Sequence, residues 1–295
     1  MTDQGTLMRR RPFTLALLAA TALAATACAP QEEEQADTVA APSSAACTPG
    51  DLPTLEEGTL TIGTDAPAYE PWFSGDDPTN GEGFESAVAY AVAEQLGYGK
   101  DAVTWTTVPF NNVIQPGAKT FDIDVNQFSI TDERRQAVDF SSPYYDVTQA
   151  VITTAGSPAE GATDLAALKG LRIGAQVATT SLDVLTDVIA PDADPVVFNT
   201  NDDAKLALQN GQVDAIVVDL PTAFYITAAE LDDGVIVGQV GDSGSSADQF
   251  GMVLAKGSPL TDCVSQAVDA LREDGTLADL EQQWLAEVAD APVLS

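Results

Sequence analysis

Short apolar runs alternate with helical patterns along most of this chain, and this alternation constrains the fold more than any other feature. The first series of runs predicts strands at residues 60–63, 103–107, 123–125 and 149–154. A helical pattern lies between the first two runs, beginning at Phe84 and ending at Gly97. Alternating strands and helices favour an α/β lobe in which helices cover a sheet.

A second series follows the Gly- and Pro-containing break at residues 155–161. It predicts strands at residues 171–175, 195–198, 214–218 and 235–240, and a helix at residues 201–210. After another break at residues 241–246, we expect a strand at residues 250–255 and helices at residues 259–274 and 276–286. Two α/β lobes joined by two connecting strands would enclose a cleft, and ligands of such sheets lie beyond the carboxyl ends of strands.

The first 27 residues have the form of an export signal, with three arginines, an apolar run at residues 13–27 and small residues before Cys28. The run is shorter than the roughly 20 residues of a membrane-spanning helix, so we expect its removal as a signal peptide. The small residues before Cys28 predict lipid attachment to this cysteine; the alternative is a plain signal peptide and an unmodified thiol. Arg10 and Arg11 also fit a twin-arginine pattern loosely, which leaves the export route open.

Residues 28–50 contain few large apolar side chains, so we expect a flexible, lipid-anchored tether ahead of the globular part. If Cys28 carries lipid, Cys47 and Cys263 remain as a pair. In an oxidising compartment this pair predicts a disulfide, with two buried free thiols as the alternative.

The chain is strongly acidic, with 12 Lys plus Arg against 45 Asp plus Glu and a net charge of −33. The leader holds three Arg and one Asp, so its removal leaves 9 basic and 44 acidic residues, a net charge of −35. Such a surface repels nucleic acid, which argues against a nucleic-acid partner. The chain also has no His, no Gly-rich phosphate loop and no carboxylates at metal-ligand spacing. Because the commonest general base is absent, binding without a cofactor or metal is favoured over hydrolysis.

Two adjacent arginines stand out within residues 126–145 of this acidic chain. Ser129 and Thr131 precede two acidic residues, a pattern typical of a helix start, where backbone N–H groups favour anions. Arg134 lies one turn further on, and a guanidinium can bind a carboxylate through two parallel hydrogen bonds. These groups predict a carboxylate receptor; the alternative is that both arginines pair with neighbouring acids. Arg135 lies about 100° further round the helix and is expected to face solvent.

Other strand ends carry polar and aromatic candidates. Thr179 and Thr180 form a hydroxyl-rich helix start, which capping alone would also explain. Asp219 ends the strand at residues 214–218 and could hold an ammonium group; the alternative is a helix N-cap. Tyr69, Trp72 and Phe128 supply aromatic surface that can pack an alkyl chain or a cation, and Trp72 is the one most expected in the core.

These motifs together resemble the extracytoplasmic solute-binding proteins of ABC importers, specifically the polar amino acid type, family 3. The resemblance runs from about residue 59 to residue 285. It is carried by Ser129-Ile130-Thr131-Asp132-Glu133-Arg134, Asp139-Phe140-Ser141-Ser142-Pro143-Tyr144-Tyr145, Gly83-Phe84-Glu85, Gly211-Gln212-Val213-Asp214-Ala215 with Asp219, and Asp274-Gly275-Thr276-Leu277. The chain departs from the family pattern at Ala87, Asn126 and Gln127, which leaves the side-chain specificity open.

The resemblance implies a two-lobe, periplasmic-binding-protein-like α/β fold with a ligand cleft between lobes joined by two hinge strands. Lobe 1 would comprise residues 51–151 and 244–295, and lobe 2 residues 152–243. By motif position, Arg134 would clamp the α-carboxylate of an amino acid with Ser129 and Thr180 as donors. Asp219 and the backbone carbonyl of Gln127 would accept from the α-ammonium. The side-chain pocket would be lined by Asp65, Tyr69 and Phe128.

We therefore expect a monomeric, lipid-anchored protein on the outer face of the cytoplasmic membrane. It would bind a free polar or basic amino acid and deliver it to an ABC permease without catalysing a reaction. The rival is an enzyme on the same fold, such as a cyclic-acid dehydratase. It would need Asp65, Glu70 or Asp219 as its general acid or base.

Overall fold

The computed structural model describes residues 47–48, 52–241, 248–285 and 291–294. The expected signal peptide, the expected lipidation site at Cys28 and most of the expected tether lie outside these residues. Within them, every helix is too short or too polar to cross a membrane.

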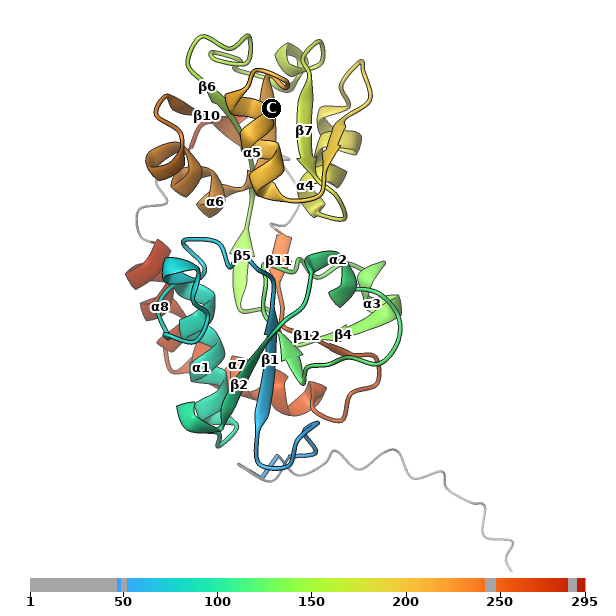
Figure 1. Cartoon of the computed structure of the whole chain (residues 1–295), viewed down its shortest axis with the longest axis vertical. Coiled ribbons are helices and arrows are strands. Elements are labelled where there is room, and N and C mark those ends of the chain that lie inside the picture. Colours follow the sequence, from blue (N-terminus) through green and yellow to red (C-terminus); the bar gives the residue numbers. More distant parts are fainter. Residues whose placement is uncertain (1–46, 49–51, 242–247, 286–290, 295) are drawn as a thin grey trace, which may run out of the picture. The chain divides into compact units, whose positions relative to one another are not determined.

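The first lobe is built on a five-stranded sheet with the order β2-β1-β3-β12-β4. Its strands are β1 (Leu60–Thr64), β2 (Val103–Thr107), β3 (Ile123–Asp124), β4 (Val138–Phe140) and β12 (Val253–Ala255). Figure 1 shows the helices beside β1 and β2, which are α1 (Phe84–Gln95), α7 (Thr261–Glu273) and α8 (Thr276–Leu285). A smaller core forms around the one-turn helices α2 (Phe110–Val113) and α3 (Arg134–Ala137). Two short 3₁₀ helices, Ser74–Asp76 and Lys100–Ala102, complete this lobe.

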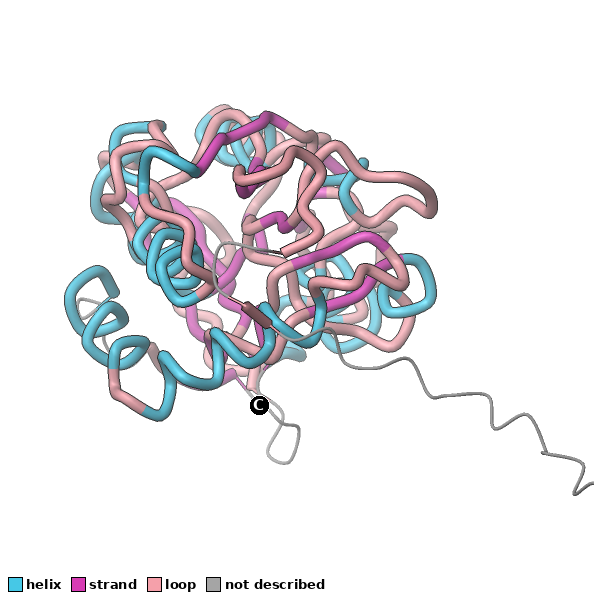
Figure 2. The backbone as a smooth tube through the Cα atoms, turned by 90° about the horizontal axis from the view of Figure 1, so that it is seen from below, coloured by secondary structure: helices cyan, strands magenta, loops and turns pink. Residues whose placement is uncertain are grey.

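The second lobe is built on a six-stranded sheet with the order β13-β10-β6-β9-β7-β8. Its strands are β6 (Gln149–Thr154), β7 (Ile173–Gln176), β8 (Val196–Phe198), β9 (Ala215–Asp219), β10 (Gly234–Val240) and β13 (Val293–Leu294). Its helices are α4 (Thr180–Asp183), α5 (Asn201–Gln209) and α6 (Leu220–Tyr225), a 3₁₀ helix at Leu165–Leu168, and π-helices at Val184–Ile189 and Ile226–Glu230. Figure 2 colours these helices cyan and the strands magenta.

Each face of the second sheet has its own apolar core, because side chains alternate along a strand. Val151 and Val217 belong to one cluster, and Ile152 and Ile216 to the other. The continuous apolar character of β6 and β9 in the sequence is thus explained by burial on both faces.

Two antiparallel strands carry the chain between the lobes. They are β5 (Tyr145–Val147) and β11 (Asp248–Phe250), which pair with each other outside both large sheets. The expected strand at residues 149–154 is β6 of the second sheet, so residues 149–151, which were expected in lobe 1, belong to the second lobe. The expected strand at residues 250–255 is split into β11 and β12. At the break, a Cβ atom on Gly251 would lie 2.8 Å from Cδ1 of Ile130, so the backbone turns at a glycine that passes close to another loop.

The end of the chain also differs from expectation. Val293–Leu294 pairs in parallel with β10 and so adds an edge strand to the sheet of the second lobe. Two residues are too short for a periodic signal, and their pairing depends on a contact more than 50 residues away in the sequence.

The expected disulfide is present: Cys47 and Cys263 are joined, with their Cα atoms 5.4 Å apart. Cys263 is buried in the first turn of α7. The bond therefore ties the beginning of the globular part to a late helix of the first lobe.

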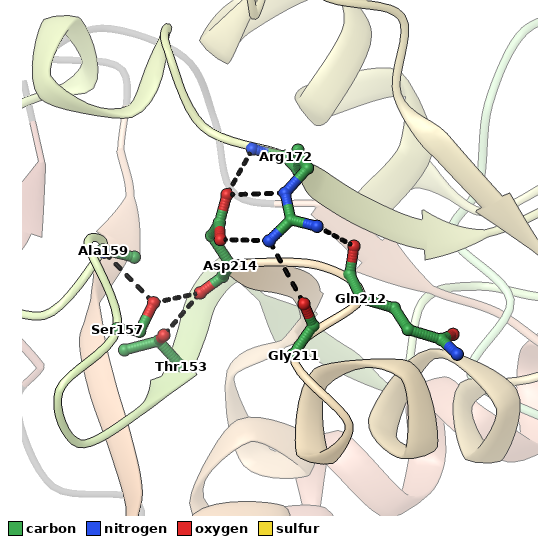
Figure 3. Close-up of polar contacts among 7 residues, drawn as sticks. All are labelled: Thr153, Ser157, Ala159, Arg172, Gly211, Gln212 and Asp214. Atoms are coloured by element: carbon green, nitrogen blue, oxygen red, sulfur yellow. Dashed lines mark hydrogen bonds and ion pairs between the residues drawn. The ribbon is translucent and has the colours of Figure 1, made fainter.

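The Gly-x-x-Asp-Ala motif at residues 211–215 has a structural role (Figure 3). Asp214 accepts hydrogen bonds from the backbone N–H and the guanidinium of Arg172, at distances between 2.7 and 3.3 Å. The same guanidinium donates to the carbonyls of Gln212 and Gly211, at 2.8 and 3.1 Å. These bonds hold the turn into β9, and the hydrogen bond from Arg172 is the chief cause of a lowered pKa of Asp214. They set the register of the strand that ends at Asp219.

Candidate ligand-binding site

Residues of both lobes line a narrow cavity. Its lining residues are Asp65, Tyr69, Phe110, Asn126, Gln127, Arg134, Gln176, Thr179, Thr180, Ser181, Asn201 and Asp219. The cavity has a volume of about 30 Å³, which is room for about two water molecules. The lobes are therefore closed onto each other, and a ligand of amino acid size requires the cleft to widen.

Arg134 bridges the two lobes at this cavity. Its guanidinium donates to the carbonyl of Ser129 at 2.7 Å in its own lobe and to the carbonyl of Ala178 at 2.8 Å in the other. It also lies 5.8 Å from the ring centroids of Phe110 and Phe128. Burial lowers the pKa of Arg134, and nearby acids oppose that shift, so the guanidinium keeps its charge. Two of its five N–H donors are used by these carbonyls, and the others remain for a ligand.

The helix start that carries Arg134 is shorter than expected. α3 is a single turn, and the hydroxyl of Thr131 accepts from the N–H of Arg134 at 3.1 Å. Arg135 is exposed, as expected. The anion-attracting group at this position is thus the Arg134 side chain and not a long helix.

Hydroxyl groups of the two lobes meet directly. Ser129 and Thr180 share a hydrogen bond of 3.0 Å between their side-chain oxygens. Thr179 is the N-cap of α4, because its hydroxyl accepts from the N–H of Leu182 at 3.2 Å. Thr179 also lines the cavity, so capping does not remove it from the site.

Asp219 lies at the end of β9 and makes no side-chain cap of α6. Its carboxylate accepts from Nε2 of Gln149 at 2.7 Å, and that amide also reaches the hydroxyl of Thr180 at 3.3 Å. Ser181 donates to the amide oxygen of Gln149 at 2.6 Å. Burial raises the pKa of Asp219 to about 7, further raised by Asp248 and opposed by Gln149 and Arg134. An added cation beside this carboxylate would favour its ionised form.

Gln127 has a left-handed backbone, with φ of 49°. Its N–H donates to Oε1 of Glu85 at 2.7 Å, and its side-chain amide donates to Oε2. Glu85 is fully buried and also accepts from the hydroxyl of Tyr144. The buried carboxylate of Glu85 therefore fixes, through hydrogen bonds, the loop in which Gln127 lines the cavity.

Asp65 and Tyr69 both line the cavity. The carboxylate of Asp65 accepts from the backbone N–H of Ala66 at 2.7 Å and of Phe110 at 3.0 Å, so it also orients the start of α2. Burial, together with the charges of Asp202 and Asp65, raises the pKa of Tyr69, which keeps its hydroxyl protonated.

Two expected ligand-binding residues lie behind the cavity wall. Phe128 is fully buried, and its ring stacks on that of Phe110 with centroids 4.4 Å apart. Phe110 is the ring that lines the cavity. Ser129 is also outside the lining set, but it is bonded to two lining residues: its hydroxyl to Thr180 and its carbonyl to Arg134. Trp72 is in the core, as expected, and its indole N–H donates to the hydroxyl of Thr222 in the other lobe at 2.9 Å.

Sequence reasoning missed five lining residues. They are Phe110, Asn126, Gln176, Ser181 and Asn201. Each lies at a strand end or a helix start, so the rule that placed Asp219 would have included them. Among the described residues, His, Cys, Asp and Glu side chains form no group of three that could hold a metal ion.

Comparisons with known proteins agree with this architecture. A model of the bacterial extracellular solute-binding proteins, family 3, matches residues 60–287. The L-cystine-binding protein TcyJ of Escherichia coli K12 is 30% identical over 238 residues, covering 78% of this chain and 83% of that protein. The putative ABC transporter arginine-binding protein 2 of the same strain is 28% identical over 234 residues, covering 77% and 90%. A solved structure of an ancestral arginine-binding protein bound to glutamine superposes with a TM-score of 0.66 at 30% identity, covering 79% of this chain and 100% of that one.

The matched region contains both sheets apart from the edge strand β13, both crossing strands and all the residues that line the cavity. This chain belongs to the bacterial extracellular solute-binding proteins of family 3.

Proposed function

We propose that this protein binds a free amino acid, polar or basic in its side chain, and delivers it to the permease of an ABC transporter. The observation that carries the proposal is that Arg134 of one lobe and Asp219 of the other line the same cavity. A zwitterionic α-amino acid needs a cation for its carboxylate and an anion for its ammonium, and this cavity offers both. Holding one charge on each lobe makes the ligand itself favour closure.

In this proposal Arg134 binds the α-carboxylate, with the hydroxyls of Ser129, Thr179 and Thr180 as further donors. The α-ammonium lies against Asp219 and the backbone carbonyl of Gln127. The ligand's side chain extends toward Asp65 and Tyr69, with Phe110 in front of Phe128. The carboxylate of Asp65 and the absence of any second basic side chain among the lining residues favour a basic or neutral polar side chain.

The proposal includes the organisation of the exported protein. Residues 1–27 are removed, Cys28 is lipidated, and residues 28–50 tether a monomer to the outer face of the cytoplasmic membrane. Lobe 1 comprises residues 51–151 and 244–295 and lobe 2 residues 152–243, except that the first residues of β6, from Gln149, and the edge strand β13 belong to the sheet of lobe 2. Mass spectrometry of the mature N-terminus, a Cys28→Ser variant that should be released from membranes, and size-exclusion chromatography test these points.

A thermal-shift screen of the standard amino acids with L-ornithine and L-cystine tests the binding function. A ligand at a hundredfold excess over its Kd adds about 2.7 kcal/mol to the free energy of unfolding. Arg134→Ala should abolish the shift, whereas Arg135→Ala, the exposed neighbour, should retain it. A wild-type protein that responds to no compound would refute amino acid binding.

One observation favours the rival enzymatic function. The pKa of Asp219 is raised to about 7, as is useful for a general acid or base. A cyclic-acid dehydratase would release water from its substrate, while a binding protein returns its ligand unchanged. Mass spectrometry of ligands recovered after incubation distinguishes the two.

A further inference from the structure

Glu85 is a buried acid that lines no part of the cavity, yet it is bonded to the loop that does. Its side chain is fully buried at the start of α1, in the first turn. Three donors converge on its two carboxylate oxygens: the N–H of Gln127, the side-chain amide of Gln127 and the hydroxyl of Tyr144. A buried carboxylate is costly unless it is bonded in this way.

The conformation of Gln127 needs support. A residue with a Cβ atom rarely adopts φ near 49°, because the Cβ approaches the following carbonyl. Both hydrogen-bonding groups that Gln127 directs to Glu85 hold it in this left-handed state. Since Gln127 lines the cavity, the shape of the cavity depends on that state.

The third partner of Glu85 leads to the hinge. Tyr144 directly precedes β5, and its backbone N–H donates to the carbonyl of Phe250 in β11 at 2.8 Å. Tyr144 is itself buried. Glu85 thus contacts a cavity-lining residue on one side and the origin of the crossing strands on the other.

We propose that Glu85 is a positioning residue, which sets the left-handed backbone of Gln127 in the binding loop and ties that loop to the hinge through Tyr144. The proposal rests on the amino acid-binding function above and adds a determinant of affinity that touches no ligand. In support, burial raises the pKa of Glu85 to about 7, although three hydrogen bonds lower it. Desolvation of this carboxylate is therefore unfavourable, and the three hydrogen bonds partly offset it.

Isothermal titration with L-arginine, L-glutamine and L-cystine tests the inference in the full globular protein. Glu85→Met removes every acceptor at nearly equal volume, and we expect it to weaken binding tenfold or more, about 1.4 kcal/mol. Glu85→Gln keeps one acceptor oxygen for the N–H of Gln127, while the Gln127 amide can turn over to meet the new amide. We expect it to stay within about threefold of the wild type. Glu82→Met is the matched control on an exposed residue three positions earlier and should bind as the wild type does.

A rescue separates positioning from general stabilisation. Glycine adopts a left-handed backbone without a Cβ clash. The double variant Glu85→Met/Gln127→Gly should therefore bind at least threefold more tightly than Glu85→Met alone. If Glu85 only stabilises α1, the two variants should bind equally. Should Glu85→Met fail to fold, Gln127→Gly and Gln127→Ala give the same information alone. Both variants lose the hydrogen bond from the side-chain amide of residue 127 to Glu85. Only alanine has a Cβ atom that disfavours the left-handed backbone, so Gln127→Ala should bind at least fivefold more weakly than Gln127→Gly.

The outcomes are distinguishable. If the wild type binds none of the three amino acids or any other in the screen, the proposed function fails. If the wild type binds and Glu85→Met binds equally well, or if alanine and glycine at position 127 are equivalent, the inference fails while the function stands.

Discussion

The pH dependence of binding is the sharpest test of the role proposed for Asp219. Its pKa is raised to about 7 in the closed, ligand-free structure, with burial as the main cause. A ligand ammonium at this carboxylate favours the ionised form and lowers the pKa on binding. Binding must then remove the proton that the free protein carries below pH 7.

The magnitude follows from the fraction of protein with an ionised Asp219. For a pKa of about 7 this fraction is about 0.9 at pH 8 and about 0.09 at pH 6, so the association constant should fall about tenfold over that range. At pH 7 about half a proton should be released for each ligand bound. Isothermal titration in phosphate and in Tris, whose ionisation enthalpies differ, measures both quantities.

The stability of the ligand-free protein should change in the opposite direction. A carboxyl group with a raised pKa binds more protons in the folded than in the unfolded state between its two pKa values. Asp219 and Glu85 therefore contribute most to stability below about pH 4, and this contribution is lost as the pH rises toward 7. We expect the midpoint of urea unfolding to be higher at pH 5 than at pH 8, other groups being equal.

The pH effect of Asp219 must be distinguished from that of its charged neighbours. Arg134, Asp248 and Glu85 interact with it, and Glu85 titrates in the same range. Glu85→Gln should keep the tenfold dependence, because the ammonium contacts Asp219. Equal affinities at pH 6 and pH 8, with no proton release at pH 7, would show that Asp219 does not bind the ammonium.

Three further predictions concern closure and stability. Thr222→Val removes the acceptor of the buried Trp72 indole and should cost the closed state about 1–3 kcal/mol, so small-angle scattering should show a more open ligand-free protein. Gly63→Ala should lower the free energy of unfolding by about 1–3 kcal/mol, because its Cβ would lie 2.2 Å from Oδ2 of the buried Asp124; Gly170→Ala, with open space around it, should be nearly neutral in the same urea titration. Reduction of the disulfide, which links residues 216 positions apart, should lower stability by up to about 5 kcal/mol if loop entropy dominates, and an unchanged urea midpoint would contradict that account.

Much of the local structure was readable from short stretches of sequence. The strands at residues 103–107 and 149–154 match β2 and β6, and the helix from Phe84 matches α1. β6 carries consecutive apolar residues because it is buried on both faces, whereas the edge strand β2 is rich in β-branched residues; neither signal needs knowledge of the partner strand. Cys47 and Cys263 were also predicted as a pair, because the expected lipidation of Cys28 leaves only these two of the three cysteines, and the pair is bonded.

The site was only partly readable. Strand ends and hydroxyl-rich turns indicated Arg134, Thr180 and Asp219, and all three line the cavity. The sequence could not show that Phe110, and not Phe128, lines the cavity. Both residues follow strands, and only the stacking of their rings decides which one faces the cavity.

The sequence by itself determined the two α/β series, the motifs of the family and the residue types available for a zwitterion. Only the tertiary structure decided which of these residues meet. Gln149 reaches Asp219, and Glu85 reaches Gln127 and Tyr144, across separations of 42 to 70 residues. Periodicity and capping arise from neighbours within one or two turns, so a single chain segment encodes them. Contacts between distant segments depend on how whole sheets and helices pack, and no local pattern specifies that packing.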